Sequence, residues 1–368
     1  MLKITNMVPL GTLISPAKTV RCGDDSYPVL SMTMHNGLVF QDDKFKKEIA
    51  SKDKSDYKVV YRNQLVISFP IDEGVLAAQR IADAGIVSPA YGIWDIDQSQ
   101  ILPEFLEKAL RCERAIAYYK AKLRGSTARR RSLPTPTLLE FTVPLPSLET
   151  QEAILGLANK VKLVIDKREQ QLQRLNDLIK ARFVEQFGDP MLNSMGWKTK
   201  RFDTICENLD SKRKPITASE REAGAYPYYG ASGIVDYVAD YLFDEDILLV
   251  SEDGANLLMR STPIAFSVSG KVWVNNHAHV VRFKDMGLQK YIEVYFSMID
   301  ISDQITGSAQ PKLNQAKLNA MMIPTPNKEE TDSFWGFLQQ VDKSKVVIQK
   351  ALDRTQMLLD GLMQCYFG

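Results

Sequence analysis

The sequence predicts an α+β protein in which two mixed α/β domains form an internal pseudo-two-fold repeat, separated by two long antiparallel α-helices that pair as a coiled-coil spacer. Three observations favour this fold class. One stretch of the chain recurs 180 residues later, so that residue 143 matches residue 323. Each copy continues into a long segment without proline whose apolar residues follow helical spacing. The segments before the two copies contain short strand-like runs bounded by Gly, Asn and Asp.

The repeat is clearest at a Pro-x-Pro step. Val143-Pro-Leu-Pro146 aligns with Ile323-Pro-Thr-Pro326, and the same offset places Phe187-Gly188 on Phe367-Gly368 without a gap. Shorter similarities precede each copy in the same order, as expected of two homologous domains with different loops. We therefore divide the chain into a first domain at 1–142, a first helical segment at 143–190, a second domain at 191–322 and a second helical segment at 323–368.

Long helices are predicted at about 150–187 and about 331–366. Apolar residues three or four positions apart give each helix one apolar seam, which weakens at 168–171 in the first copy and at 343–345 in the second. Prolines just upstream mark both starts, because proline is tolerated only before or within the first helical turn. A narrow apolar stripe needs a partner, so we expect the two helices to pair antiparallel; packing of each helix onto its own domain is the alternative.

Both domains are predicted to combine several strands with one clear helix. The strand-like runs are 58–61, 65–68, 246–250, 271–274 and 279–283, and the helical stretches are 103–122 and 288–299. Strands interleaved with a single helix favour α+β domains over doubly wound sheets.

Composition favours a cytoplasmic binding protein over an enzyme or a membrane protein. No apolar run approaches the ~18 residues that span a bilayer, and the four cysteines are scattered without a C-x-x-C pair. Nucleotide-binding, hydrolase and zinc-protease motifs are absent, as is the D/N-P-P-aromatic loop of DNA methyltransferases. His277 and His279 would share a strand face, but no carboxylate or cysteine is close in sequence, so no metal site is expected.

The helical copies carry a family resemblance. The run from Val143 to Pro190 resembles the central helical region of type I restriction-modification specificity subunits, with its proline-rich start, long helix and Phe-Gly-Asp stop. Thr306-Gly-Ser-Ala-Gln-Pro-Lys-Leu-Asn314 and Ser88-Pro-Ala-Tyr91 resemble further elements of these subunits. The first domain departs from the pattern, because it closes with Gly125-Ser-Thr-Ala-Arg-Arg-Arg131.

The resemblance implies a non-catalytic subunit that binds double-stranded DNA sequence-specifically in the cytoplasm. Each domain would be a target-recognition domain that reads one half-site of a bipartite target, and the helical spacer would hold the two domains at a fixed separation. Two modification subunits would dock on the spacer and methylate adenine, and restriction subunits would join them to translocate and cut DNA. The chain itself would need no cofactor, since S-adenosylmethionine, ATP and Mg would belong to the partner subunits.

DNA-contacting residues are predicted from side-chain chemistry, with a net charge of only +1 leaving local clusters to supply the attraction. Phosphate contacts are typically made by Lys, Arg and small hydrogen-bond donors in loops. The candidates for these contacts are Arg124, Ser126, Arg129, Arg130, Arg131, Lys212, Arg213, Lys214, Lys271, Ser308 and Lys312. Base readout favours Asn, Gln and Arg, and the candidates are Arg80, Asn256, Asn275 and Gln310.

Aromatic residues outside a single seam suggest where modification subunits dock. The predicted partner-binding residues are Phe183, Phe187, Phe334, Trp335 and Phe337. Three other functions remain open at this point: a stand-alone DNA-binding regulator, a nuclease with a degenerate site, and a coiled-coil adaptor without affinity for nucleic acid.

Overall fold

The computed structural model describes residues 6–34, 36–44, 53–69, 71–123, 133–307 and 309–368. The chain forms two compact units. Unit 1 comprises Met1–Arg168 together with Ala351–Gly368, and unit 2 comprises Glu169–Lys350. No helix among the described residues combines the length and hydropathy that a bilayer crossing requires.

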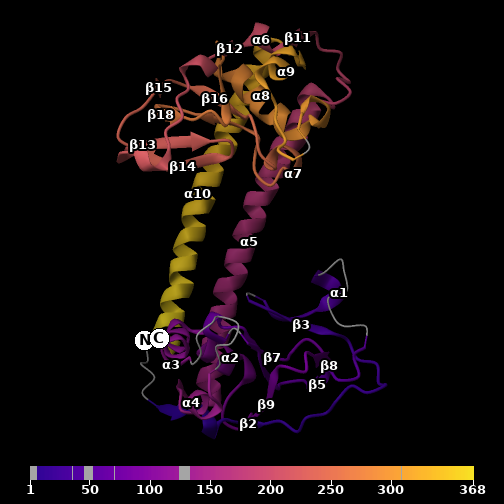
Figure 1. Cartoon of the computed structure of the whole chain (residues 1–368), viewed down its shortest axis with the longest axis vertical. Helices are drawn as coiled ribbons and strands as arrows, with labels where there is room; N and C mark the ends of the chain where they lie inside the picture. The colour runs from indigo at the N-terminus through magenta and orange to yellow at the C-terminus, as the bar shows by residue number, and fades with distance from the viewer. Residues whose placement is uncertain (1–5, 35, 45–52, 70, 124–132, 308) are drawn as a thin grey trace. The chain divides into compact units, whose positions relative to one another are not determined.

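Two helices of equal length dominate the chain. Helix α5 spans Leu148–Phe187 and helix α10 spans Lys328–Phe367, each 40 residues long and offset by the predicted 180 positions (Figure 1). Side chains just before each helix accept hydrogen bonds from amides of its first turn. The Thr150 amide donates to Ser147 Oγ at 3.3 Å, and the Glu330 amide donates to Asn327 Oδ1 at 2.9 Å. Both helices begin two or three residues before the predicted starts.

Helix α5 ends at a glycine. Gly188 has a φ of +81°, a left-handed conformation that glycine adopts without strain, and its amide donates to the Val184 carbonyl at 2.9 Å. The sequence Gly188-Asp-Pro190 therefore acts as the predicted helix stop.

In unit 1 the central element is a four-stranded antiparallel sheet of order β2-β9-β6-β7. Its strands are β2 (Ile14–Pro16), β9 (Gly92–Ile96), β6 (Leu65–Ile67) and β7 (Leu76–Ala78). Three two-stranded pairs accompany it: β1 (Met7–Pro9) with β10 (Thr142–Pro144), β3 (Leu30–Thr33) with β4 (Gly37–Phe40), and β5 (Lys58–Tyr61) with β8 (Ala84–Val87).

Besides parts of α5 and α10, the described residues of unit 1 form the α-helices α1 (Gln41–Lys44), α2 (Pro103–Arg111), α3 (Glu113–Lys122) and α4 (Thr135–Leu139). The single helix predicted over 103–122 is divided, because Cys112 is extended, with φ −70° and ψ 161°. The core of unit 1 lies between the sheet and helices α2, α3, α4, α5 and α10. Within it, Phe105 of α2 contacts Phe367 of α10 with ring centroids 4.8 Å apart.

The described residues of unit 2 form two four-stranded sheets. The first has the order β12-β19-β16-β17, and its strands are β12 (Glu207–Asn208), β19 (Ala278–Arg282), β16 (Ile247–Ser251) and β17 (Ala265–Val268). The second has the order β14-β13-β18-β15, and its strands are β14 (Gly233–Val238), β13 (Ala223–Gly230), β18 (Lys271–Val274) and β15 (Phe243–Asp244). All five residues of β16 are buried, since Leu248 and Val250 face one apolar cluster while Ile247 and Leu249 face another. A strand buried on both faces explains the uninterrupted apolar run.

The remaining elements of unit 2 are α6 (Phe202–Ile205), α7 (Asn256–Met259), α8 (Met286–Met298), α9 (Gln315–Ala320) and the strand pair β11 (Thr199–Arg201) with β20 (Met322–Pro324). Helix α8 begins after Asp285, whose carboxylate accepts the Leu288 amide at 2.8 Å, as an N-cap does.

The internal repeat is present in the topology of the two units. The order β2-β9-β6-β7 of unit 1 corresponds to β12-β19-β16-β17 of unit 2, and the pair β1-β10 corresponds to β11-β20. In each unit a short helix, α4 or α9, precedes the closing strand and a long helix follows it. The predicted α+β fold with two related domains is thus confirmed.

The two long helices contact each other within each unit. In unit 1, Val161 and Ile165 of α5 pack with Leu362 of α10 in one buried cluster. In unit 2, Phe183 of α5 contacts Phe334 of α10. Early residues of one helix meet late residues of the other in both units, so the pairing is antiparallel, as predicted.

Candidate nucleic-acid interface

At one edge of unit 2, the segment after β16 runs beside the segment before α9. The Leu313 amide donates to the Glu252 carbonyl at 2.8 Å, and the Gly254 amide donates to the Pro311 carbonyl at 3.0 Å. These bonds place Lys312, a predicted phosphate contact, next to the end of a central strand.

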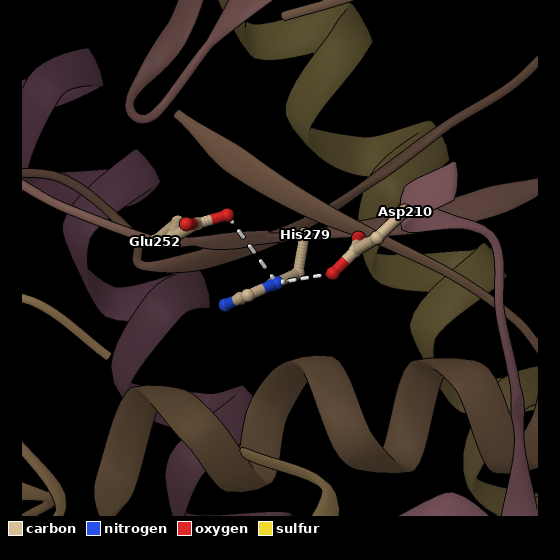
Figure 2. Close-up of side chains that lie close together, drawn as sticks. All are labelled: Asp210, Glu252 and His279. Carbon is tan, nitrogen blue, oxygen red and sulfur yellow. Dashed lines mark hydrogen bonds and ion pairs between the residues drawn. The ribbon is translucent and has the colours of Figure 1, made fainter. Parts of the chain in front are cut away.

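Beneath this edge lies a fully buried histidine. His279 of β19 places Nδ1 2.6 Å from Asp210 Oδ2 and Nε2 2.8 Å from the carbonyl oxygen of Leu313, as Figure 2 shows for the aspartate. A carbonyl oxygen only accepts, so Nε2 carries a hydrogen. Asp210 also accepts from the Val280 amide at 2.8 Å and from Gln315 Nε2 at 3.1 Å, as an ionised carboxylate does. Nδ1 therefore carries a hydrogen as well, and the ring is an imidazolium.

Two further cations complete the cluster. Arg213 lies 2.6 Å from a Glu252 carboxylate oxygen and 3.3 Å from Asp210 Oδ2, and Lys312 Nζ lies 3.0 Å from the other Glu252 oxygen. Glu252 also lies 3.6 Å from His279 Nδ1 (Figure 2). We call these five residues, Asp210, Arg213, Glu252, His279 and Lys312, the charge network.

The cations keep both carboxyl groups ionised despite their burial. For Asp210, desolvation acts to raise the pKa, but the hydrogen bond and charge of His279, the Val280 amide and Arg213 together outweigh it, and the pKa is lowered. For Glu252, desolvation likewise acts to raise the pKa, but hydrogen bonds from Arg213 and Lys312 lower it overall. Buried charges that are paired and hydrogen-bonded in this way are compatible with a folded interior.

The donor set does not fit a metal ion. Asp210, Glu252 and His279 offer ligand atoms within 4.8 Å of one another. However, both imidazole nitrogens are already hydrogen-bonded, and Arg213 and Lys312 supply the positive charge that a metal would otherwise bring. The structure therefore gives no support for a metal at this place.

Sequence reasoning considered His279 but missed its partners. The two carboxylates come from distant segments. Asp210 lies 69 residues before His279 in the sequence, and Glu252 lies 27 residues before it. Only the pairing of β19 with β16, and the short 3-10 helix Asp210–Lys212, bring them together. No signal in the linear sequence marks these three residues as neighbours.

The predicted DNA contacts in unit 2 fall into two groups. Lys212, Lys214, Lys271, Gln310 and Lys312 are exposed at the surface. The ammonium group of Lys271 lies over the Tyr241 ring, 4.7 Å from its centroid. Lys312 is exposed although its ammonium group also binds Glu252. All five side chains can be reached from solvent.

The other group has structural partners within unit 2. The Arg213 guanidinium belongs to the charge network and also donates to the Ala278 carbonyl at 2.8 Å. Buried Asn275 accepts the His277 amide at 2.8 Å, and Asn256 holds the turn after α7 by accepting the Thr262 amide at 2.9 Å. Base or phosphate contacts by these side chains are not supported by this conformation.

In the first domain, Arg80 forms ion pairs with Glu104 at 2.8 Å and Glu107 at 3.7 Å. The remaining candidates of that domain, and Ser308 of the second, lie outside the described residues: Arg124, Ser126, Arg129, Arg130 and Arg131.

The aromatic residues predicted to bind partners require a correction. Phe183, Phe187 and Phe334 are buried in the main core of unit 2, so a partner cannot contact them in this structure. Trp335 and Phe337 are half-buried against the same core, and Lys290 lies 5.7 Å from the Trp335 ring centroid. The sequence pattern could not separate a face that packs on its own domain from a face that packs on a partner.

Exposed apolar residues occur elsewhere on the long helices. On the part of each helix that belongs to unit 1 they are Leu157, Leu163, Val164, Met357 and Leu358, and on the part that belongs to unit 2 they are Leu178, Val184, Val346 and Val347. Val347 is 67% exposed and Met357 is 72% exposed. Contiguous exposed apolar side chains are typical of protein–protein interfaces, whereas isolated ones occur on most surfaces.

Comparison of the sequence with known proteins finds similarity to type I restriction specificity proteins. Residues 195–355 match the family model of the type I restriction modification DNA specificity domain. A Haemophilus influenzae protein assigned as a type I restriction enzyme specificity subunit is 34% identical over 140 residues, which cover 38% of this chain. The match spans only 36% of that relative's length.

Two solved structures have a similar fold. The S subunit of a type I restriction-modification system from M. genitalium has a TM-score of 0.52 at 14% identity, covering 99% of this chain and 96% of its own. A structure from a study of assembly and conformational transition of the type I system has a TM-score of 0.58 at 15% identity, covering 98% and 97%. At such identities the likeness establishes the fold alone.

Proposed function

We propose that the chain belongs to the type I restriction-modification specificity family and is the subunit that recognises the DNA target for the enzymes of such a system. Exposed lysines in the second domain, at positions 212, 214, 271 and 312, would supply phosphate contacts. With a net charge of +1, the attraction would be local to these surfaces.

We infer further that the target is bipartite, with one half-site for each domain. The observation that carries this is the repeated topology, in which the order β2-β9-β6-β7 recurs as β12-β19-β16-β17. Two related domains with different loops would each read a different short sequence. The gap between the half-sites would follow from the two long helices, since 40 residues at ~1.5 Å each give roughly 60 Å.

The chain would act without catalysis of its own and would position partner subunits. Modification subunits would methylate the DNA with S-adenosylmethionine, and restriction subunits would use ATP and Mg. We propose that the exposed apolar residues of α5 and α10 form the docking surface for the modification subunits, in place of the buried phenylalanines.

The docking proposal is tested by co-purification. Val347→Asp places a charge at a position that is 67% exposed, so the fold should be retained while the modification subunit is lost. Ile234→Asp, at an exposed apolar position of β14 away from the long helices, is the matched control. Retention of a stoichiometric complex by the Val347 variant would contradict docking at this surface.

Methylome sequencing of the host with and without the gene tests the recognition function. We expect the loss of one bipartite methylated motif when the gene is deleted. An unchanged methylome together with altered transcription would instead favour a stand-alone regulator. If the purified chain does not bind duplex DNA at any salt concentration, a coiled-coil adaptor without affinity for nucleic acid would be favoured instead.

A further inference from the structure

We propose that His279 is a positioning residue for DNA recognition by unit 2, which holds the segment carrying Lys312 at the edge of the sheet. The inference rests on the proposed function, because it concerns how one recognition domain presents its contacts. His279 is fully buried and cannot touch DNA itself. Its effect would be transmitted through the groups to which it is bonded.

The transmission follows two short routes. Along the backbone, His279 Nε2 donates to the Leu313 carbonyl at 2.8 Å, and this residue directly follows Lys312. Through side chains, Nδ1 lies 2.6 Å from Asp210 and 3.6 Å from Glu252, and Glu252 binds the ammonium group of Lys312 at 3.0 Å. Main chain and side chain of Lys312 are thus both fixed by one histidine.

Lys312 in turn closes the loop that contains exposed Gln310. Its amide donates to the Thr306 carbonyl at 2.7 Å, and the Thr306 amide donates to its carbonyl at 2.8 Å. A shift of Lys312 would therefore move the base of this loop. Displacements of about 1 Å in a recognition element are enough to weaken hydrogen-bonded contacts, because hydrogen bonds tolerate only a narrow range of distances.

Both routes depend on a proton at each imidazole nitrogen. A neutral ring could donate to only one of its two acceptors, so either Asp210 or Leu313 would lose its bond. The charged groups that face the ring are Asp210 from the 3-10 helix, Glu252 from the end of β16, and, through these carboxylates, Arg213 and Lys312. Loss of either hydrogen bond should release the segment around Lys312.

Among the described residues, a buried histidine of this kind occurs in unit 2 alone. The protein has three histidines, and His35 of the first domain lies outside the described residues, so the described part of unit 1 contains none. Strand β9, which corresponds to β19, has the sequence Gly-Ile-Trp-Asp-Ile. The half-site read by unit 1 therefore serves as an internal control for the half-site read by unit 2.

The experiment uses the full-length chain and a randomised duplex DNA library. Sequencing of the bound fraction gives the motif, and duplexes with one half-site scrambled then report the affinity for the other. For His279→Gln we expect affinity for one half-site to fall about tenfold, the effect of losing one charged hydrogen bond, and affinity for the other to stay unchanged. Equal loss at both half-sites, or loss at neither, would overturn the proposal.

Two control variants distinguish positioning from a general loss of stability. His277→Gln removes the exposed neighbour, and Val281→Ala weakens the same sheet without touching the charge network. Both should keep the wild-type affinity for each half-site. A loss at one half-site in Val281→Ala equal to that in His279→Gln would show that the effect follows from stability, and would overturn the proposal.

Lys312→Ala decides the matter even where His279→Gln does not fold. It removes an exposed side chain, so the fold should be retained, and it should weaken the same single half-site. Loss of affinity at both half-sites, or at neither, would overturn the role of the segment that His279 holds. A library from which the wild-type chain enriches no sequence would overturn the proposed function and this inference with it. Enrichment of a bipartite motif with no effect of either variant would overturn the inference alone.

Discussion

Phe183 of α5 meets Phe334 of α10 edge to face in the core of unit 2, with ring centroids 5.7 Å apart. Phe187 lies 5.2 Å from Phe334, and Tyr291 of α8 stacks on Phe183 at 5.2 Å. Edge-to-face and offset-stacked arrangements are the favoured ones for aromatic pairs. These rings join the two long helices to the body of their own domain.

Truncation of one ring should therefore destabilise unit 2. Phe334→Ala removes a fully buried side chain, and we expect a loss of about 3–5 kcal/mol in the free energy of unfolding. Val347→Ala on the same helix is exposed and should change stability by less than about 0.5 kcal/mol. Urea unfolding followed by circular dichroism measures both. Equal effects would show that the aromatic cluster does not contribute to the core in solution.

The long helices were predictable because their signals are local. Proline before the start, glycine after the end and apolar spacing in between are all read within one segment. At the predicted break in the first seam, Arg168 donates hydrogen bonds to the Ala351 carbonyl and to Thr355 Oγ1 of α10. A polar residue thus makes a contact between the helices at this position. In the sequence the same position appears only as an interruption of the apolar spacing.

The site was less predictable because it depends on contacts between distant segments. Arg213 stands between two lysines in sequence, and all three were predicted to contact phosphate. The structure buries Arg213 against Asp210 and Glu252 and leaves Lys214 exposed. Arg213 and Lys214 have the same charge and the same neighbours in sequence. Only the fold shows that Arg213 belongs to the charge network and that Lys214 is exposed.

These two neighbours should respond differently to substitution. Lys214→Ala should weaken binding to all duplex sequences alike and lower the salt slope of the affinity by about one unit, with thermal stability unchanged. Arg213→Ala removes a cation that both Glu252 and Asp210 share, and should cost about 3–5 kcal/mol of stability. Binding titrations over a salt series, with melting curves alongside, compare the two. A stable Arg213→Ala protein with a reduced salt slope would reverse the assignment.

Acid should release the stability that the charge network provides. The pKa values of Asp210 and Glu252 are lowered in the folded chain, so the unfolded chain binds more protons as the pH approaches the ordinary carboxyl range near 4. Their contribution is therefore present above that range and is lost as the pH falls through the folded-state pKa. Thermal unfolding of the wild type between about pH 7 and about pH 3 should show this decline.

Asp210→Asn provides the matched comparison for the acid series. The amide cannot ionise, and it presents a donor to the donors of His279 and Gln315. The variant should be less stable by about 3–5 kcal/mol at neutral pH, and the difference from the wild type should shrink as the pH falls. A difference that stays constant down to pH ~3 would show that the pKa of Asp210 is not lowered in the folded chain.

The spacing between half-sites is tested by lengthening a helix. Helix α5 has 40 residues, and its ~60 Å corresponds to roughly 18 base pairs at ~3.4 Å each. An insertion of four residues after Gln171 adds ~6 Å, close to two base pairs, and rotates the following part by about 40° beyond a full turn. Paired helices accommodate a four-residue insertion as a stutter.

The readout is the methylated motif in cells that carry the insertion. Both half-sites should be unchanged, because neither recognition domain has been altered, and the gap between them should lengthen by about two base pairs. Replacement of four residues at the same place, without a change in length, is the control and should leave the gap as it is. If the insertion variant remains active with the original gap, the helices do not determine the spacing, and the globular domains or the partner subunits must fix it instead.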